Sequence, residues 1–168
     1  MDRRLLLLGG VAGLLSACGR SEAAPRAQDA ADRAFADSPF RRVSDAEWRR
    51  RLSPAAYAVL RREDTERPRT STLNAEKRRG VFACAGCGLP LFRSEWKYES
   101  GTGWPSFWQV IDGAVGRKRD LVMLIPRTEY HCARCLGHQG HVFDDGPAPT
   151  RLRYCNNGVA LRFNPQAA

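Results

Sequence analysis

Hydrophobic and polar positions divide the chain into four stretches of different character. An apolar run, Leu5 to Ala17, follows a charged start. Residues 19–40 are mostly Ala, Arg, Ser, Asp and Glu, with few large apolar side chains. Residues 44–62 carry helix-capping patterns, and from Gly80 onward short apolar and aromatic runs alternate with Gly, Pro and Asn. This order predicts a targeting segment, a tether, a short helical region and a β domain.

The helical region contains two start signals. Ser44 with Glu47 forms a capping-box pattern, which predicts a short helix through Trp48 and Leu52. Ser53 then precedes Pro54, an N-cap followed by the residue favoured at the first helical position, and predicts a second helix through Arg62.

The β domain is predicted from short runs rich in β-branched and aromatic residues, with no convincing helix between them. The runs are GVFAC (80–84), PLFRSEWKY (90–98), SFWQVI (106–111), DLVMLI (120–125), HVFDD (141–145), LRYC (152–155) and VALRF (159–163). We therefore predict a mainly β domain of antiparallel strands over residues 41–168, with a short helical N-terminal preface.

The N-terminal run is too short to remain as a membrane-spanning helix and has the length and flanks of a signal peptide. Leu15-Ser16-Ala17-Cys18 resembles the lipobox of bacterial lipoproteins, in which Cys18 would carry lipid after cleavage. An ordinary secretory signal that ends in Cys is the alternative. Arg3-Arg4 also resembles a twin-arginine signal. We predict a signal peptide over residues 1–18, a flexible tether over 19–40, and an exported, membrane-anchored lipoprotein on the periplasmic side.

Charge adds little to this picture. Lys and Arg number 27 against 18 Asp and Glu, a formal net charge of +9, but the basic residues are scattered along the chain. No nucleic-acid recognition motif accompanies them, so we predict no nucleic-acid partner. No feature requires more than a monomer.

Four of the six cysteines form two C-x-x-C pairs, Cys84 with Cys87 and Cys132 with Cys135. Two such pairs match a tetrahedral set of four sulfur ligands, which predicts one structural zinc ion between two β-hairpins. Two disulfides, or a redox-active C-x-x-C, are the alternatives.

Cys155 remains as an unpaired thiol, and a free cysteine is often only a small buried apolar residue. All the histidines cluster upstream in HCARCLGHQGH, and His138 and His141 are candidates to stabilise a thiolate or donate protons. His131 fits a packing role beside the metal ligands better. Asn157 follows two residues after Cys155, either as a hydrogen-bond donor or as a turn residue before Gly158.

The run SGTGWPSFW is a loop, because its glycines and Pro105 interrupt any regular element. The loop displays Trp104, which could line a pocket for an apolar group or simply join the core.

Three runs together resemble the B-type methionine-R-sulfoxide reductases. They are GVFACAGCGLPLFRSEWKYESGTGWPSFW, RTEYHCARCLGHQGHVFDDGPAPTRLRYCNNGVALRF and the earlier TERP (65–68). The resemblance extends from about Ser44 to Phe163, and its motifs occur in the family's order.

The resemblance implies a β-tent fold of two antiparallel sheets, with the zinc site away from the active site. It implies that Cys155 is the catalytic nucleophile, with His138, His141 and Asn157 around the sulfoxide oxygen and Trp104 against the substrate methyl. Arg153 matches an arginine beside the nucleophile, and we assign it no role in the chemistry. The implied reaction reduces methionine-R-sulfoxide in peptides and proteins, through a cysteine sulfenic acid that a thiol then reduces.

The chain departs from the family pattern at three positions. Gln139 replaces the usual Leu, and Asn156 replaces a β-branched residue, a poor choice for a strand. Thr102 occupies the place of a second, resolving cysteine in some relatives. We therefore predict a cycle with one cysteine, in which an external, thioredoxin-like thiol attacks Cys155.

Two other classes of function remain open from the residues alone. A lipid-anchored zinc-staple binding module would explain the paired cysteines and the charge, but not the polar residues near Cys155. A Cys-His acyl hydrolase would explain Cys155 and one histidine. It gives no reason for the GWPSF loop.

Overall fold

The computed structural model describes residues 27–121 and 126–167. The predicted signal peptide, including Cys18, and residues 19–26 of the predicted tether lie outside the described residues. Within the described ranges, no helix has both the length and the apolar character needed to cross a membrane.

The helical preface contains α2 (Asp45–Arg51) and α3 (Pro54–Arg62), which confirms both predicted helices. Their starts follow the predicted caps: the Ser44 hydroxyl accepts from the Glu47 N–H, and the Ser53 hydroxyl accepts from the Ala56 N–H. The described residues also contain four short 3-10 helices: η1 (Pro39–Arg42), η2 (Thr72–Asn74), η3 (Ser94–Trp96) and η4 (Gly158–Ala160).

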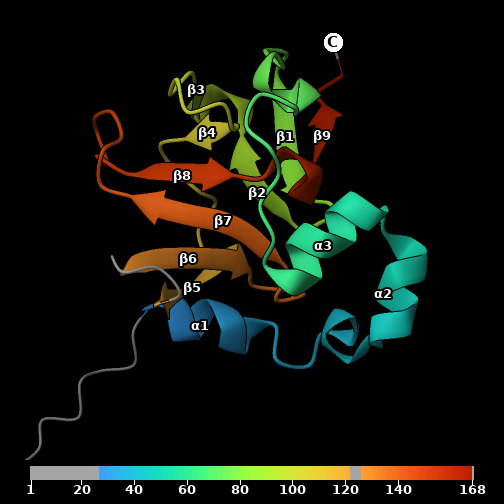
Figure 1. Cartoon of the computed structure of the whole chain (residues 1–168). Helices are drawn as coiled ribbons and strands as arrows, with labels where there is room; N and C mark the ends of the chain where they lie inside the picture. The colour runs from blue at the N-terminus through green and yellow to red at the C-terminus, as the bar shows by residue number, and fades with distance from the viewer. Residues whose placement is uncertain (1–26, 122–125, 168) are drawn as a thin grey trace, which may run out of the picture.

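Two antiparallel sheets make up most of the remaining structure (Figure 1). The small sheet has the order β2-β1-β9 and the large sheet the order β3-β4-β8-β7-β6-β5. The strands are β1 (Gly80–Cys84), β2 (Pro90–Arg93), β3 (Lys97–Tyr98), β4 (Ser106–Phe107), β5 (Val115–Asp120), β6 (Arg127–Cys132), β7 (His138–Phe143), β8 (Arg153–Asn156) and β9 (Leu161–Pro165). The predicted fold class, mainly β with two antiparallel sheets and a helical preface, is confirmed.

An aromatic core joins the two sheets. Phe92 on β2 stacks on Phe107 of β4 with 4.1 Å between ring centroids, and Phe82 on β1 contacts Phe107 edge to face. Tyr130 and Tyr154, from β6 and β8, close this cluster and are almost completely buried. Packing on this scale supplies most of the folding free energy and fixes β8 in the centre of the large sheet.

Strand β5 (Val115–Asp120) was not predicted. The strand predicted over residues 120–125 falls mostly on residues 122–125, which lie outside the described residues, so it stays a prediction. The run VGRKRD of β5 lacks apolar alternation because its polar residues bond to polar groups of other elements, as Lys118 does to Glu129 and Asp120 to His141.

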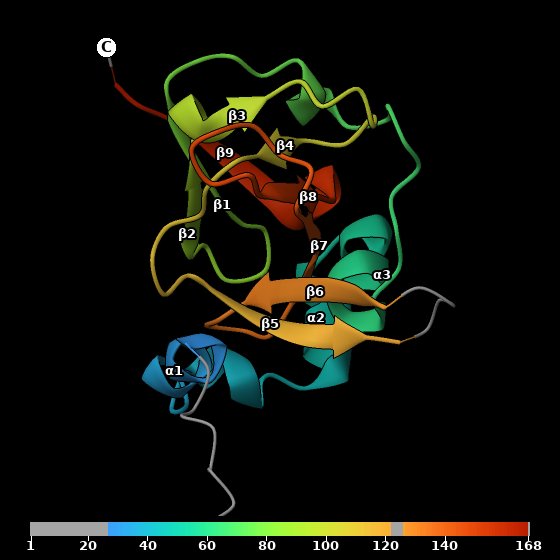
Figure 2. The ribbon, with the colours of Figure 1, turned by 90° about the vertical axis from the view of Figure 1, so that its left-hand side faces the viewer.

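The predicted tether also differs from the structure in its second half. Residues 27–34 form helix α1 (Ala27–Ala34), which lies beside β5 in both views (Figures 1 and 2). Ala31 is buried there, and the Asp32 carboxylate lies 3.1 Å from His131 Nε2. Alanine-rich sequence has high helix propensity, and the contact with β5 adds the burial that the composition did not indicate.

Candidate active site

Cys155 lies in the middle of the large sheet, on β8. Its strand neighbours place it opposite Ser106 of β4 and opposite His141 of β7. Residues directly opposite each other in an antiparallel pair point to the same face. The sheet register therefore brings the Cys155 thiol and the His141 imidazole together, although fourteen positions of sequence, 141 to 155, separate them.

A cavity of about 120 Å³ opens above this pair. It is lined by Thr65, Trp104, Arg127, Gly140, His141, Phe143, Cys155, Asn156 and Asn157. An apolar wall with a few convergent polar groups and a nucleophilic sulfur is the usual composition of a small-molecule or side-chain site. Of the predicted site residues, Cys155, His141, Asn157 and Trp104 line this cavity, and His138 does not.

The environment of Cys155 both hinders and favours the thiolate. Burial raises the pKa of the Cys155 thiol, while the charge of Arg153 and the hydroxyl of Thr102 oppose that rise. Arg153 is fixed by two 2.8 Å hydrogen bonds to the carboxylate of Asp145 and lies 4.3 Å from the centre of the Phe143 ring. The resemblance matched Arg153 to an arginine beside the nucleophile without a role in the chemistry, whereas in the structure its charge acts on the pKa of the Cys155 thiol.

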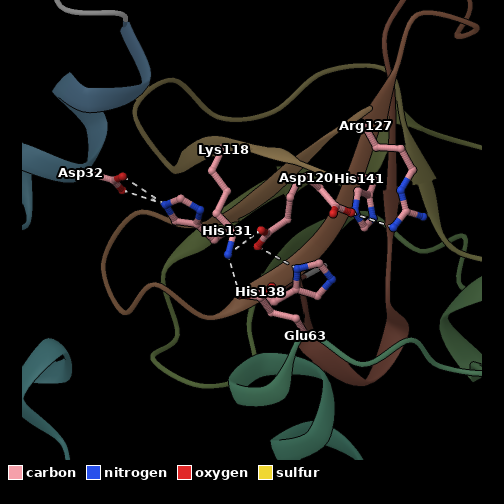
Figure 3. A network of polar contacts seen from close by, with 9 residues as sticks. Asp32, Glu63, Lys118, Asp120, Arg127, His131, His138 and His141 are labelled. Atoms are coloured by element: carbon pink, nitrogen blue, oxygen red, sulfur yellow. Dashed lines mark hydrogen bonds and ion pairs between the residues drawn. The ribbon is translucent and has the colours of Figure 1, made fainter. Parts of the chain in front are cut away.

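His141 is oriented by a carboxylate. Its Nε2 lies 2.8 Å from Asp120 Oδ2, and the same oxygen accepts from Arg127 Nη2 at 2.7 Å (Figure 3). The arginine favours the ionised carboxylate, which can only accept, so Nε2 of His141 carries the proton. Burial lowers the pKa of His141, and the hydrogen bond to Asp120 counteracts that decrease.

His138 lies behind His141, with 5.6 Å between the ring centroids. Its Nδ1 is 2.8 Å from Glu129 Oε1, and Glu129 Oε2 is 2.9 Å from Lys118 Nζ (Figure 3). Burial lowers the pKa of His138 to about 4, so the ring is neutral at physiological pH. This geometry fits support of His141 better than direct contact with a molecule in the cavity.

Asn157 and Trp104 are held by one residue that the sequence analysis did not single out. The Asn157 Oδ1 accepts from the backbone N–H of Glu66 at 2.9 Å, and the Glu66 carbonyl accepts from Trp104 Nε1 at 2.8 Å. The Glu66 carboxylate also accepts from the Gly158 N–H. Glu66 belongs to the TERP run, which was part of the resemblance, but no local pattern indicates that it would fix the indole.

Thr102 lies beside the sulfur, with 4.0 Å between its Oγ1 and Cys155 Sγ. Its hydroxyl also contacts Ser100 Oγ at 2.8 Å, and Ser100 contacts Ser106 Oγ at 2.7 Å. The structure thus places a hydroxyl next to the nucleophile.

The four paired cysteines meet away from the cavity, at the turn after β1 and the turn after β6. All four sulfurs are buried and lie within 4.8 Å of one another. Cys84 and Cys135 are 3.6 Å apart, and Cys87 and Cys132 are 3.4 Å apart. Four thiolates around an ion with bonds of about 2.3 Å would be separated by about 3.8 Å, so the donor set fits one tetrahedral metal ion. His131 lies beside this cluster and contacts Asp32, not the cavity (Figure 3).

Comparison with known proteins gives a consistent result. Residues 52–165 match the SelR domain. A peptide methionine sulfoxide reductase MsrB of Bradyrhizobium diazoefficiens is 51% identical over 73% of this chain and 89% of its own length. Proteins of the same name from Leptospira interrogans and Methanosarcina barkeri are 47% and 50% identical, over 95% and 87% of their lengths. Among solved structures, the Mis18 "Yippee-like" domain gives a TM-score of 0.43 at 20% identity over 54% of this chain and all of its own, too low a similarity to support a functional argument.

Proposed function

Since this chain belongs to the SelR family and is a peptide-methionine (R)-S-oxide reductase, we propose that Cys155 is the nucleophile of its redox cycle, whose sulfur is oxidised as the methionine sulfur is reduced. The observation that supports this most strongly is the convergence of Cys155, His141 and Trp104 on one cavity. The substrate is methionine-R-sulfoxide within oxidised peptides and proteins.

In the first half of the cycle, the Cys155 thiolate attacks the sulfoxide sulfur. A sulfur–sulfur bond forms, the sulfur–oxygen bond breaks, and the protonated oxygen leaves as water. A water molecule then attacks the Cys155 sulfur and breaks the sulfur–sulfur bond, so that methionine leaves and Cys155 becomes a sulfenic acid. One thiol and one sulfoxide thus become one sulfenic acid and one thioether, so the methionine sulfur is reduced and the cysteine sulfur is oxidised. Arg153 assists by favouring the thiolate over the thiol.

The sulfoxide oxygen is a poor leaving group until it is protonated. His141 lines the cavity, and its Nε2–H already donates to Asp120, so Nδ1 is the nitrogen directed to the substrate oxygen. Asp120 stabilises the imidazolium that must form before the proton is given. His138 keeps His141 in place through ring contact.

Trp104 orients the substrate. Its indole N–H donates to the Glu66 carbonyl, which fixes the ring as a wall of the cavity. A rigid aromatic wall binds the apolar methyl group of methionine sulfoxide. The cavity is small, about 120 Å³, so it admits the end of one side chain while the rest of the polypeptide stays outside.

In the second half of the cycle, an external thiol attacks the sulfenic acid, forms a mixed disulfide with Cys155 and releases water. A second thiol then releases Cys155 and leaves with the disulfide. We propose a thioredoxin-like dithiol as this reductant, because the thiols of Cys84, Cys87, Cys132 and Cys135 are gathered in the metal site.

We propose that the ion held by these four cysteines is zinc and that its role is structural. Four sulfur donors leave no coordination position for a substrate. When bound, the ion joins the turn after β1 to the turn after β6, and so ties the small sheet to the large one.

We further propose that the protein is exported and anchored by lipid at Cys18, on the periplasmic side of a membrane. The support is the Leu15-Ser16-Ala17-Cys18 sequence directly after the apolar run. The match to the SelR domain begins at residue 52, so the N-terminal segment lies outside the part shared with the family.

The function is tested with two peptides that contain the R or the S epimer of methionine sulfoxide, with a dithiol as reductant. Wild-type protein should yield methionine from the R epimer only. Cys155→Ser should abolish turnover while the melting temperature stays unchanged, because the exchange removes the nucleophile and little volume. Turnover of the S epimer, or activity in the variant, would refute the assignment; a binding module or an acyl hydrolase would reduce neither peptide.

A further inference from the structure

Gln139 on β7 has a buried amide group. The residue has no exposed surface, and its Oε1 is buried without a hydrogen-bond partner among the described residues. Its Nε2–H donates to the sulfur of Cys84 at 3.4 Å. Burying an amide while its oxygen lacks a hydrogen-bond partner costs free energy. The presence of such an amide beside the Cys84 sulfur therefore needs an explanation.

The backbone carbonyl of Gln139 is hydrogen-bonded to Asn157, a residue that lines the cavity. The carbonyl oxygen accepts both the backbone N–H of Asn157 at 2.9 Å and the Nδ2–H of Asn157 at 3.0 Å. Asn157 lines the cavity and accepts from Glu66, which in turn accepts from the Trp104 indole. An unbroken series of hydrogen bonds therefore runs from the Cys84 sulfur to the aromatic wall of the cavity.

We propose that Gln139 is a positioning residue that couples the metal site to the substrate cavity. When Cys84 binds metal as a thiolate, its sulfur is a stronger acceptor than a neutral thiol, and the amide of Gln139 is held firmly on it. Partners of this kind orient metal ligands and tune metal affinity. In this chain the same residue also fixes Asn157, so metal binding and cavity geometry depend on each other. The coupling to the cavity rests on the proposed function, whereas the bond to the sulfur does not.

The bond is tested directly in wild-type protein loaded with the spin-half isotope of cadmium. The side-chain amide protons of Gln139 should show scalar coupling to the metal across the N–H···S bond. An assigned Gln139 amide signal without this coupling would overturn the proposal, and the measurement requires no variant and no activity.

The coupling is tested with Gln139→Leu, which keeps the volume and removes the amide. Metal affinity, measured by competition with a chelator, should fall about tenfold, and the KM for the R-sulfoxide peptide should rise several-fold with a smaller change in kcat. Gln139→Met serves if the leucine variant does not fold. Tyr130→Phe is the control, because it removes a buried hydrogen bond to Asn156 that touches no sulfur and should leave metal affinity unchanged.

Two results would contradict the coupling. Unchanged metal affinity in a folded Gln139 variant would show that the amide does not support Cys84. Lower affinity with an unchanged KM would show that the effect stops at the metal. A wild type with metal coupling but no reductase activity would instead refute the proposed function and leave the bond intact.

Discussion

The pKa of Cys155, the proposed nucleophile, depends on a balance between burial and the positive charge of Arg153. Burial raises the pKa of the Cys155 thiol, and burial also lowers the pKa of His141. The proposed reactive pair requires a thiolate and an imidazolium, so activity should rise with pH up to the lower pKa, stay level between the two pKa values and fall above the higher one. Each additional unit between the two pKa values reduces the fraction of this reactive form about tenfold.

Arg153→Gln should increase the difference between the two pKa values by changing the pKa of Cys155. The loss of the guanidinium charge should raise the pKa of the Cys155 thiol by on the order of one unit. The measurement is the rate of alkylation of Cys155 as a function of pH, whose midpoint should move to higher pH. Arg119→Gln, at an exposed position of β5, is the matched control. An unmoved midpoint in the Arg153 variant would show that Arg153 only fills space.

Asp120→Asn should increase the difference between the two pKa values by changing the pKa of His141. The Asp120 carboxylate favours the charged form of His141, so its neutralisation should lower the pKa of His141 further. We expect kcat to fall about tenfold or more and the low-pH limb, which follows the lower pKa of His141, to shift to lower pH. A kcat–pH profile identical to that of the wild type would exclude Asp120 as the partner that charges His141.

At the scale of elements, the loop between β3 and β4 bears on how the proposed sulfenic acid of Cys155 would be reduced. Thr102 lies between Gly101 and Gly103, both at positive φ, and its hydroxyl is 4.0 Å from Cys155 Sγ. In the absence of reductant, a sulfoxide substrate should leave a dimedone-reactive sulfenic acid on Cys155. Peptide mapping that finds Cys155 joined to another cysteine of the wild-type chain would contradict the cycle with one cysteine.

Thr102→Cys should convert this cycle into one that forms a disulfide. The two sulfurs must approach to about 2.05 Å, and the flanking glycines give the loop the freedom to move by that amount. The expected product after one turnover is a disulfide between residues 102 and 155, detected by mass spectrometry. A persistent sulfenic acid in this variant would show that the loop is too rigid.

The turn after β1 and the turn after β6 should no longer be joined by a metal ion when one cysteine ligand is removed. Cys84→Ser leaves three sulfurs for the ion, and because metal-binding free energy contributes to folding free energy, the variant should lose metal. Its melting temperature should fall by more than about 10 °C. Elemental analysis and a thermal melt check both effects, with Cys155→Ser as the control that keeps metal. An equal melting temperature in the two variants would contradict the structural role.

Sequence information was sufficient where one local signal determined the structure. The Ser44 and Ser53 caps predicted both helices, and the paired spacing of the cysteines predicted the cluster of four sulfurs that the structure contains. It was insufficient where a tertiary contact decided the outcome. Strand β5 was missed because its polar run shows no apolar alternation. A bulge between β6 and β7 changes the register near His131, so His138 and His141 lie on the same side of the sheet despite a spacing of three residues, which the sequence pattern could not indicate. Glu66 carries no local sign of its role, since it acts through backbone groups.

At the scale of the whole molecule, the distance between the catalytic domain and a membrane depends on where the folded part begins. The composition predicted a flexible tether to residue 40, but α1 starts at Ala27 and contacts β5, and Arg41 Nη2 donates to the carbonyl oxygens of Asp32 and Ala133. Eight residues then separate Cys18 from α1. Even fully extended, they reach only roughly 30 Å.

We therefore expect the lipidated protein to act close to the membrane surface. The formal net charge of the whole sequence is +9, and Asp2, Arg3 and Arg4 of the signal peptide contribute only +1 of it, so the lipidated protein stays basic and is attracted to anionic lipid headgroups. Mature protein isolated from its host should be found in the membrane fraction, and mass spectrometry should identify Cys18 as a lipid-bearing N-terminus. Cys18→Ser is the matched variant: it lacks the acceptor thiol, so it should lose the lipid and leave the membrane fraction at high salt, while purified protein keeps full activity on a short sulfoxide peptide. Retention of Met1, or an unmodified Cys18 in the mature wild type, would exclude the lipid anchor and with it the short distance between the folded domain and the membrane.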